Sequence, residues 1–221
     1  MRWYEIAPQW ISAIGTVLAV IVALFSKIIR DWYNRPKINM SCPNSKQCRE
    51  VIEQGTESSD SSSEIRIRIK LENSGNYIAN HAALFVDTYY KKRAKDETYV
   101  KNELTPIQMR DYRKSKPAQI APHLIYFFDI ASIRLYDDMT EQDGVGKPKQ
   151  FYKLYLLGAE HNQELGRGTF VIPLKFYSSR IDVKINYLKI YWESNDFSTD
   201  KEHFDCQMLT EKEFKNLKIA D

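Results

Sequence analysis

An uncharged stretch near the N-terminus is the feature that most constrains what this chain can form. Residues 6–26 read IAPQWISAIGTVLAVIVALFS and contain no formally charged side chain. As an α-helix, 21 residues span about 32 Å, close to the roughly 30 Å hydrocarbon core of a bilayer. A helix of a globular core is usually shorter and polar along one face. The stretch therefore predicts a single transmembrane helix.

Aromatic and basic side chains flank this stretch. Trp10, Trp32 and Tyr33 are expected to be interface anchors, because indole and phenol rings favour the headgroup region. Arg2 precedes the stretch, and four basic residues follow it: Lys27, Arg30, Arg35 and Lys37. Because basic residues stay on the cytoplasmic side, we expect a single-pass protein of the cell (inner) membrane, with its N-terminus outside and its C-terminal domain in the cytoplasm.

Two other interpretations of the stretch are open, a buried core helix and a cleaved signal peptide. A signal peptide needs a basic first region and a small-x-small cleavage site, whereas the apolar stretch here ends in LFSK at 24–27. Within the stretch, Gly15, Ala19 and Ala23 recur every four residues. Small side chains at this spacing share one helix face and let two helices approach closely. We expect this face to support self-association.

The averages of the whole chain exclude several other classes of protein. The 221 residues are 43% hydrophobic and 28% charged, which excludes a disordered, collagenous or multi-span chain. A net charge of +3 is too small to indicate duplex nucleic acid as a partner. Three cysteines are too few for a disulfide-built scaffold, and an odd number suits a reducing compartment.

The chain after residue 36 has the periodicity of β-strands. In 64–73, EIRIRIKLEN, isoleucines alternate with basic residues, which predicts a strand with one buried and one wet face. Pro173 indicates an edge strand or a bulge, and a change of parity near Leu188 indicates a bulge or two strand pieces. The polar region 98–121 is expected to be a long surface excursion. Further strands are expected at 37–40, 82–90, 124–130, 151–157, 168–177, 183–193 and 204–209.

Eight or nine short strands with no long amphipathic helix among them predict a mainly β fold. The preferred architecture is an antiparallel, immunoglobulin-like β-sandwich, with a small β-barrel as the alternative. Thr210 and Glu213 match a capping box, which predicts a terminal helix at 211–219. The expected organisation is an anchor and juxtamembrane segment at 1–36, a first strand and serine-rich linker at 37–63, the cytoplasmic sandwich at 64–210, and a helix or tail at 211–221.

Motifs for catalysis are missing from the sequence. It contains neither G-x-S-x-G nor H-E-x-x-H, and GVGK at 144–147 lacks the spacing and the following hydroxyl residue of a phosphate-binding loop. We therefore predict no catalytic residues and no cofactor. The chain is expected not to be an enzyme.

Two basic clusters are candidates for binding an anionic ligand. The first is Lys91, Lys92, Arg93 and Lys95, directly after two tyrosines; the second is Arg110, Arg113 and Lys114. Basic side chains interleaved with aromatic rings can hold a nucleotide through phosphate contacts and stacking. An ordinary charged surface is the alternative, because acidic residues lie between the clusters.

Four residues with soft ligand atoms are weak candidates for a metal site: Cys42, Cys48, His203 and Cys206. They could form a tetrahedral zinc site if the first and last strands are neighbours. Their spacing matches no standard zinc motif, so no metal is predicted, and three unpaired thiols with a surface imidazole are the alternative.

These expectations combine into a non-enzymatic, membrane-anchored module that binds or senses a protein or small ligand at the inner membrane face. Its expected partners are the lipid bilayer and a second copy or another protein. The alternative is an oligomerising membrane effector whose β domain senses a nucleotide. In architecture that arrangement resembles some bacterial membrane-tethered defence effectors.

Overall fold

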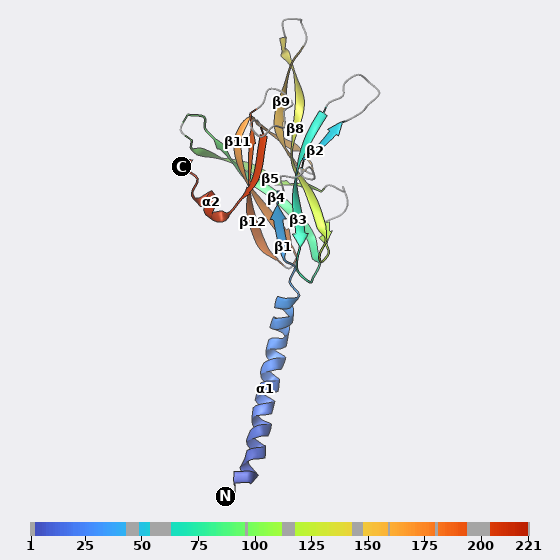
Figure 1. The fold of residues 1–221 in the computed structure, drawn as a ribbon, viewed down its shortest axis with the longest axis vertical. Helices are drawn as coiled ribbons and strands as arrows, with labels where there is room; N and C mark the ends of the chain where they lie inside the picture. The colour runs from blue at the N-terminus through green and yellow to red at the C-terminus, as the bar shows by residue number, and fades with distance from the viewer. Residues whose placement is uncertain are drawn as a thin grey trace.

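The computed structural model describes residues 3–42, 49–53, 63–95, 97–111, 118–142, 148–158, 160–179, 181–193 and 204–220. Within them the chain forms one long helix, then strands, a short helix and a last short strand (Figure 1). The elements are α1 (Trp3–Tyr33), β1 (Ile38–Ser41), β2 (Arg49–Glu53), β3 (Ser63–Asn73), β4 (Ala79–Lys92), β5 (Tyr99–Gln108), β6 (Arg110–Asp111), β7 (Ala118–Ile120), β8 (Ile125–Gln142), β9 (Pro148–Leu157), β10 (Asn162–Gly166), β11 (Gly168–Ser178), β12 (Ile181–Trp192), β13 (Phe204–Leu209), α2 (Glu211–Lys215) and β14 (Ile219–Ala220).

The strands form two seven-stranded sheets. The first sheet has the order β1-β3-β8-β9-β10, with β2 also paired to β3 and β6 to β8. The second has the order β13-β12-β11-β4-β5-β14, with β7 paired to β4. Every described ladder is antiparallel except that of β14 with β5.

One hydrophobic core joins the two sheets. Ile67 and Ile69 of β3 belong to the same buried cluster as Leu84 of β4, Phe170 of β11 and Trp192 of β12. Together the sheets form a half-barrel. The expected mainly β content is correct, but the expected fold class, a transmembrane helix followed by an immunoglobulin-like sandwich, is wrong.

Several strands differ from their predicted form for local reasons. Region 98–121, expected to be a surface excursion, contains β5, which pairs with β4 over most of its length. Pro173 lies in β11 between two neighbours, so it is not at an edge; instead the register with β4 shifts between Val171 and Lys175. β12 pairs without a break past Leu188, so the bulge predicted there is wrong.

Helix α2 packs an aromatic side chain against the outer face of the second sheet. Phe214 of α2 stacks on Tyr187 of β12, with ring centroids 3.9 Å apart, and meets Tyr90 of β4 at 5.2 Å. The two tyrosines lie on the face of the sheet away from the core, so the helix covers part of that face. The capping box of Thr210 and Glu213 is present as predicted, although α2 ends at Lys215 rather than near residue 219.

A buried asparagine fixes the connection between α1 and the sheets. The Asn73 side chain accepts from the backbone N–H of Lys37 at 3.1 Å and donates to the carbonyls of Tyr77 and Ile120. Close to it, a Cβ at Gly75 would lie 2.5 Å from the Arg35 carbonyl oxygen, so only glycine fits in this turn. The chain therefore enters β1 through a tightly packed junction, while α1 extends away from the strands (Figure 1).

The prediction of a transmembrane anchor is wrong. Among the residues that the structure describes, no helix is both long enough and apolar enough to cross a membrane. The predicted single-pass topology and the predicted location in the inner membrane depend on that anchor, so both are also wrong.

Candidate functional site

A cavity of about 1060 Å³ lies at one end of the second sheet. It is lined by the neighbouring strands β12, β11, β4 and β5 and by the connections that leave them. Five of its described side chains are basic and two are acidic: Lys91, Lys92, Arg93, Lys95 and Arg167 against Glu97 and Glu193. Asn102, Thr169 and Tyr191 add polar groups. We call this feature the basic cavity.

Lys91 places its charge over the end of the hydrophobic core. It is in register with Phe170 of the adjacent strand, so the two side chains share a face of the sheet. The Lys91 Nζ atom lies 5.3 Å from the centroid of the buried Phe170 ring and donates to the Leu165 carbonyl at 3.4 Å. The aromatic face and the carbonyl hold the ammonium group at the wall of the cavity.

Two glycines flank Arg167, which lines the same wall of the basic cavity. Gly166 ends β10 with a φ of 77°, and Gly168 begins β11 with a φ of 124°. A side chain at either position would strain the backbone, even though a Cβ at Gly168 would meet Lys91 Cε at an ordinary 3.7 Å. These glycines let the chain pass from the first sheet to the second with Arg167 between them.

The connection from β4 to β5 forms another wall of the basic cavity. The Arg93 backbone N–H donates to the Thr98 carbonyl at 2.8 Å, and Glu97 has a φ of 57°. Lys92 Nζ lies 3.0 Å from Glu97 Oε1. Their hydrogen bond raises the pKa of Lys92 and lowers the pKa of Glu97, so both are charged at neutral pH. Within this ion pair, one basic and one acidic charge of the lining neutralise each other.

Tyr191 and Glu193 stand on the side of the cavity formed by β12. The Tyr191 hydroxyl donates to the Glu193 carboxylate, and this hydrogen bond raises the pKa of Tyr191. Tyr191 is therefore a neutral phenol at physiological pH. Its ring adds an aromatic surface to the lining of the cavity.

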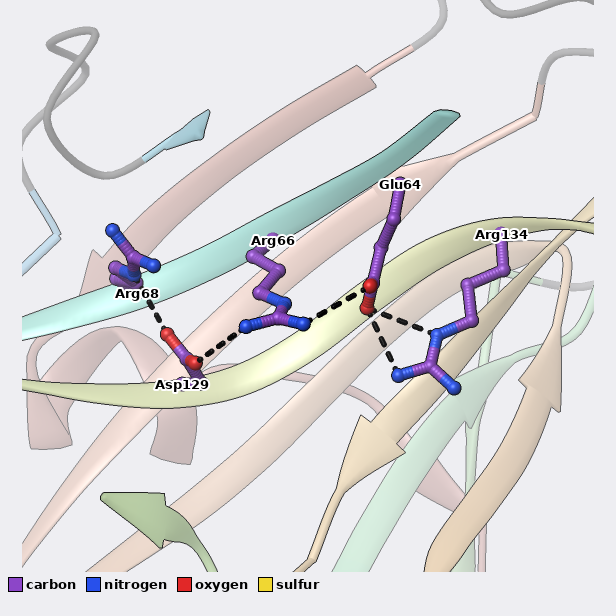
Figure 2. Close-up of polar contacts among 5 residues, drawn as sticks. All are labelled: Glu64, Arg66, Arg68, Asp129 and Arg134. Atoms are coloured by element: carbon purple, nitrogen blue, oxygen red, sulfur yellow. Dashed lines mark hydrogen bonds and ion pairs between the residues drawn. The ribbon is translucent and has the colours of Figure 1, made fainter. Parts of the chain in front are cut away.

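A second group of charged residues lies on the first sheet, and Figure 2 shows how its members connect. Arg68 Nε donates to Asp129 Oδ1 at 2.7 Å, and Arg66 spans from Asp129 Oδ2 at 3.6 Å to Glu64 Oε2 at 3.2 Å. Arg134 Nε and Nη2 both reach Glu64 Oε1 at 2.9 Å. We call these five residues the charge chain.

The charge chain is largely withdrawn from water. Glu64, Arg68 and Asp129 are buried, with 4%, 6% and 1% of their surface exposed. The alternation in β3 predicts a wet face for its basic residues; this is wrong for Arg68, because the carboxylates of Glu64 and Asp129 neutralise the arginines. Burial opposes ionisation of Glu64, but the hydrogen bonds and charges of Arg66 and Arg134 outweigh it and hold its pKa below the ordinary value.

All four carboxylate oxygens of the charge chain bind an arginine. The two carboxylates are therefore satisfied by arginines of the same group, which suits a structural role in joining β3 to β8. The basic cavity differs, because its lining carries more positive than negative charge and is open to solvent. Of the two groups, the cavity is the better candidate for binding an external anion.

The structure brings the first predicted basic cluster together in one site. Lys91, Lys92, Arg93 and Lys95 all line the basic cavity. The second cluster is not tested: Arg110 belongs to β6 but its side chain lies outside the described residues, as do Arg113 and Lys114. Sequence reasoning missed Arg167 and Tyr191. The G-R-G sequence at 166–168 was the available signal for Arg167.

The predicted zinc candidates are only partly described. Cys42 and Cys206 lie with their Sγ atoms 2.9 Å apart, whereas Cys48 and His203 fall outside the described residues. Within the described part of the chain, no three metal-ligating side chains gather at one point. The end of β1 and β13 are thus close, as a zinc site would have required, but Cys48 and His203 lie outside the described residues.

The residues expected to act on α1 are exposed where they are described. Trp10 and Tyr33 are 65% and 63% exposed, and the side chains of Lys27 and Trp32 lie outside the described part of the chain. Arg30, Arg35 and Lys37 are exposed. A Cβ at Gly15 would meet nothing within 4 Å, and Ala19 and Ala23 are equally exposed. The small-residue face is therefore open.

Comparison with protein-family models, with curated proteins and with solved structures finds no match for this chain.

Proposed function

We propose that this chain is a non-enzymatic binding module whose basic cavity takes a phosphate-bearing small ligand of the nucleotide class. The observation that carries the proposal is the lining: five basic side chains against two acidic ones around about 1060 Å³. Such a volume is at the upper end of the roughly 300–1,000 Å³ of ordinary small-molecule sites. A surface with more basic than acidic side chains attracts multiply charged anions.

The types of side chain in the cavity support a nucleotide more than a simple anion. Lysine and arginine side chains from two separate connections, Lys91 to Lys95 and Arg167, can contact phosphate oxygens from both sides. Tyr191 offers a ring on which a base can stack. The Asn102 side-chain amide donates to the Val100 carbonyl at 3.0 Å, which leaves its oxygen as an acceptor for a base or sugar.

The same lining favours binding over catalysis. Its described residues include no histidine, cysteine or serine, which are the groups that most often act as a nucleophile or a general base. The two carboxylates are engaged, Glu97 with Lys92 and Glu193 with Tyr191. Holding a ligand is what this arrangement supports best.

Calorimetric titration of the full chain with ATP, pyrophosphate and inorganic phosphate tests the proposal. We expect ATP to bind most tightly, and the double variant Lys91→Glu/Lys95→Glu to weaken ATP binding tenfold or more, because each reversal replaces attraction with repulsion. Arg167→Glu should also weaken ATP binding. The matched control is Lys101→Glu, because Lys101 is not part of the lining although its neighbours Val100 and Asn102 are.

Failure of all three probes to bind, or equal loss of binding in Lys101→Glu and in Lys91→Glu/Lys95→Glu, would contradict the proposal. Turnover of ATP that requires the cavity residues would contradict its non-enzymatic part. Binding of pyrophosphate as tightly as ATP would show that the base is not recognised and would limit the ligand to polyphosphates.

We also propose that α1 mediates self-association. Its described apolar side chains are exposed over 10–26, for example Ile11 at 71% and Val22 at 65%. An exposed apolar surface of this length marks an interaction site. Gly15 and Ala19 form a flat strip on one helix face, where a second copy of the helix can pack closely.

Chemical cross-linking of the full chain measures this association. We expect Gly15→Leu/Ala19→Leu to reduce the cross-linked dimer, because larger side chains separate the helices. The matched control is Val17→Leu/Ile21→Leu, which changes the opposite face of the same helix. Unchanged cross-linking in the first variant, or equal loss in both, would contradict the proposal.

A further inference from the structure

We infer that Cys42 and Cys206 form a reversible disulfide that joins the two sheets of the half-barrel. Their Sγ atoms lie 2.9 Å apart, although the two residues are separated by 164 positions in the chain. This distance is well inside ordinary non-bonded contact of two sulfur atoms, and only about 0.9 Å longer than a disulfide bond. A small side-chain adjustment is enough to bring the atoms to bonding distance.

The bond would cross a junction between edge strands. Cys42 directly follows β1, which stands at one end of the strand order of the first sheet. Cys206 lies in β13, which stands at one end of the order of the second sheet. A second contact crosses nearby: Lys184 Nζ of β12 donates to the Ile38 carbonyl of β1 at 2.5 Å. The two sheet edges are therefore held side by side independently of the cysteines.

The two thiols differ in their access to an oxidant. Cys206 is 3% exposed and belongs to the hydrophobic core, whereas Cys42 is only partly buried and packs against that core. Cys42 is therefore the thiol that a small reagent meets first, and Cys206 is placed to react second.

The oxidant required is a low-molecular-weight disulfide, R–S–S–R. The Cys42 thiolate attacks one of its sulfur atoms, forms a mixed disulfide and releases one R–S⁻. The Cys206 thiolate then attacks Cys42 Sγ and releases the second R–S⁻. Each released thiolate takes up one of the protons lost by the two cysteines. The chain is thus oxidised by two electrons, and the reagent is reduced to two R–SH. An excess of thiol reverses both steps.

Peptide mapping of the oxidised full chain tests the inference. The chain is equilibrated with glutathione disulfide, remaining thiols are alkylated, and the protein is digested with trypsin. Cleavage after Lys37, Lys46 and Lys201 separates the three cysteines into peptides 38–46, 47–49 and 202–212. We expect 38–46 joined to 202–212, with a mass about 2 Da below the sum of the reduced peptides. Oxidation should raise the apparent Tm by about 5–10 °C, and dithiothreitol should reverse the rise.

Cysteine variants separate this pairing from its alternatives. Cys48→Ser is the matched control and should form the same bridge, with the same rise in Tm. Cys42→Ser and Cys206→Ser should each lose both the bridge and the rise. A bridge that contains peptide 47–49 would overturn the inference, as would full alkylation of both thiols after oxidation. Zinc retained by the reduced chain at one equivalent, together with protection of both thiols from oxidation, would overturn it in favour of a metal site.

Discussion

The charge chain on the first sheet and the basic cavity on the second use the same kinds of side chain for opposite purposes. In the charge chain, three arginines share two carboxylates, and every carboxylate oxygen is engaged. In the cavity, five basic side chains face two acidic ones, each of which is engaged with a residue of the lining. The first group is largely buried and nearly neutral, and the second is open and positive.

The difference shows that the number of basic residues does not identify a binding site. Arg66 and Arg68 form as basic a sequence as Lys91 and Lys92, but Asp129 comes from 61 residues away to neutralise Arg68. A buried charge needs such a partner, because transfer of an unpaired ion out of water costs several kcal/mol. A solvent-exposed charge needs no such partner, because water solvates it, and a ligand can reach it.

Among the variants that distinguish the charge chain from the basic cavity, Asp129→Ala should lower the free energy of unfolding the most. Removing this carboxylate leaves Arg68 buried without its partner at 2.7 Å and releases one end of Arg66. We expect a loss of about 3–5 kcal/mol in the free energy of unfolding, measured by urea denaturation.

Glu103→Ala is the control for that loss. Glu103 is also the acidic partner of a basic side chain, Lys101 at 2.6 Å, but it is 77% exposed. Its removal should leave the urea midpoint unchanged, because exposed pairs contribute little. Equal midpoints for Asp129→Ala and the wild type would refute a structural role for the charge chain.

Glu64→Gln should have a smaller effect that depends on pH. The pKa of Glu64 is lowered from 4.5, so the folded state favours its ionised form. A lowered pKa contributes stability above the unfolded value, and this contribution is lost as the pH falls through the folded value. The variant should therefore be less stable than the wild type at pH 7, and the two stabilities should converge as the pH falls through the folded pKa of Glu64. A difference that is constant between pH 7 and pH 3 would show that ionisation of Glu64 is not its source.

Lys95→Glu should give the smallest change in stability. Lys95 is exposed in the connection between β4 and β5, within a lining of excess positive charge. We expect the free energy of unfolding to stay within about 0.5 kcal/mol of the wild type, because no buried partner is lost. A loss as large as that of Asp129→Ala would mean that the basic cavity is a structural element like the charge chain.

Local pattern predicted much of the secondary structure. The alternation of isoleucine with charged residues located β3, and the Thr210–Glu213 capping box located the start of α2. Prediction from local pattern failed where a residue or strand distant in the chain determines the local structure. β5 is polar along much of its length and forms a strand because β4 supplies its ladder. The apolar outer face of β12 at Tyr187 has its explanation in Phe214, which arrives from α2.

The candidate site was predictable in part. Lys91 to Lys95 are consecutive or nearly so, and they reach one cavity because a single connection carries them. Arg167 comes from the connection between β10 and β11, and nothing near residue 91 indicates that it will arrive there. The same holds for Cys206, whose distance from Cys42 along the chain hides their contact.

The sequence by itself determined several of the long strands and the start of α2, because side-chain alternation and capping act over a few neighbouring residues. It also determined the apolar character of α1. Only the tertiary structure decided how the two sheets curve into a half-barrel, which arginines are neutralised and which basic side chains stay open to a ligand. Those outcomes depend on distances between residues far apart in the chain, and electrostatic attraction and burial are set by such distances rather than by order along the sequence.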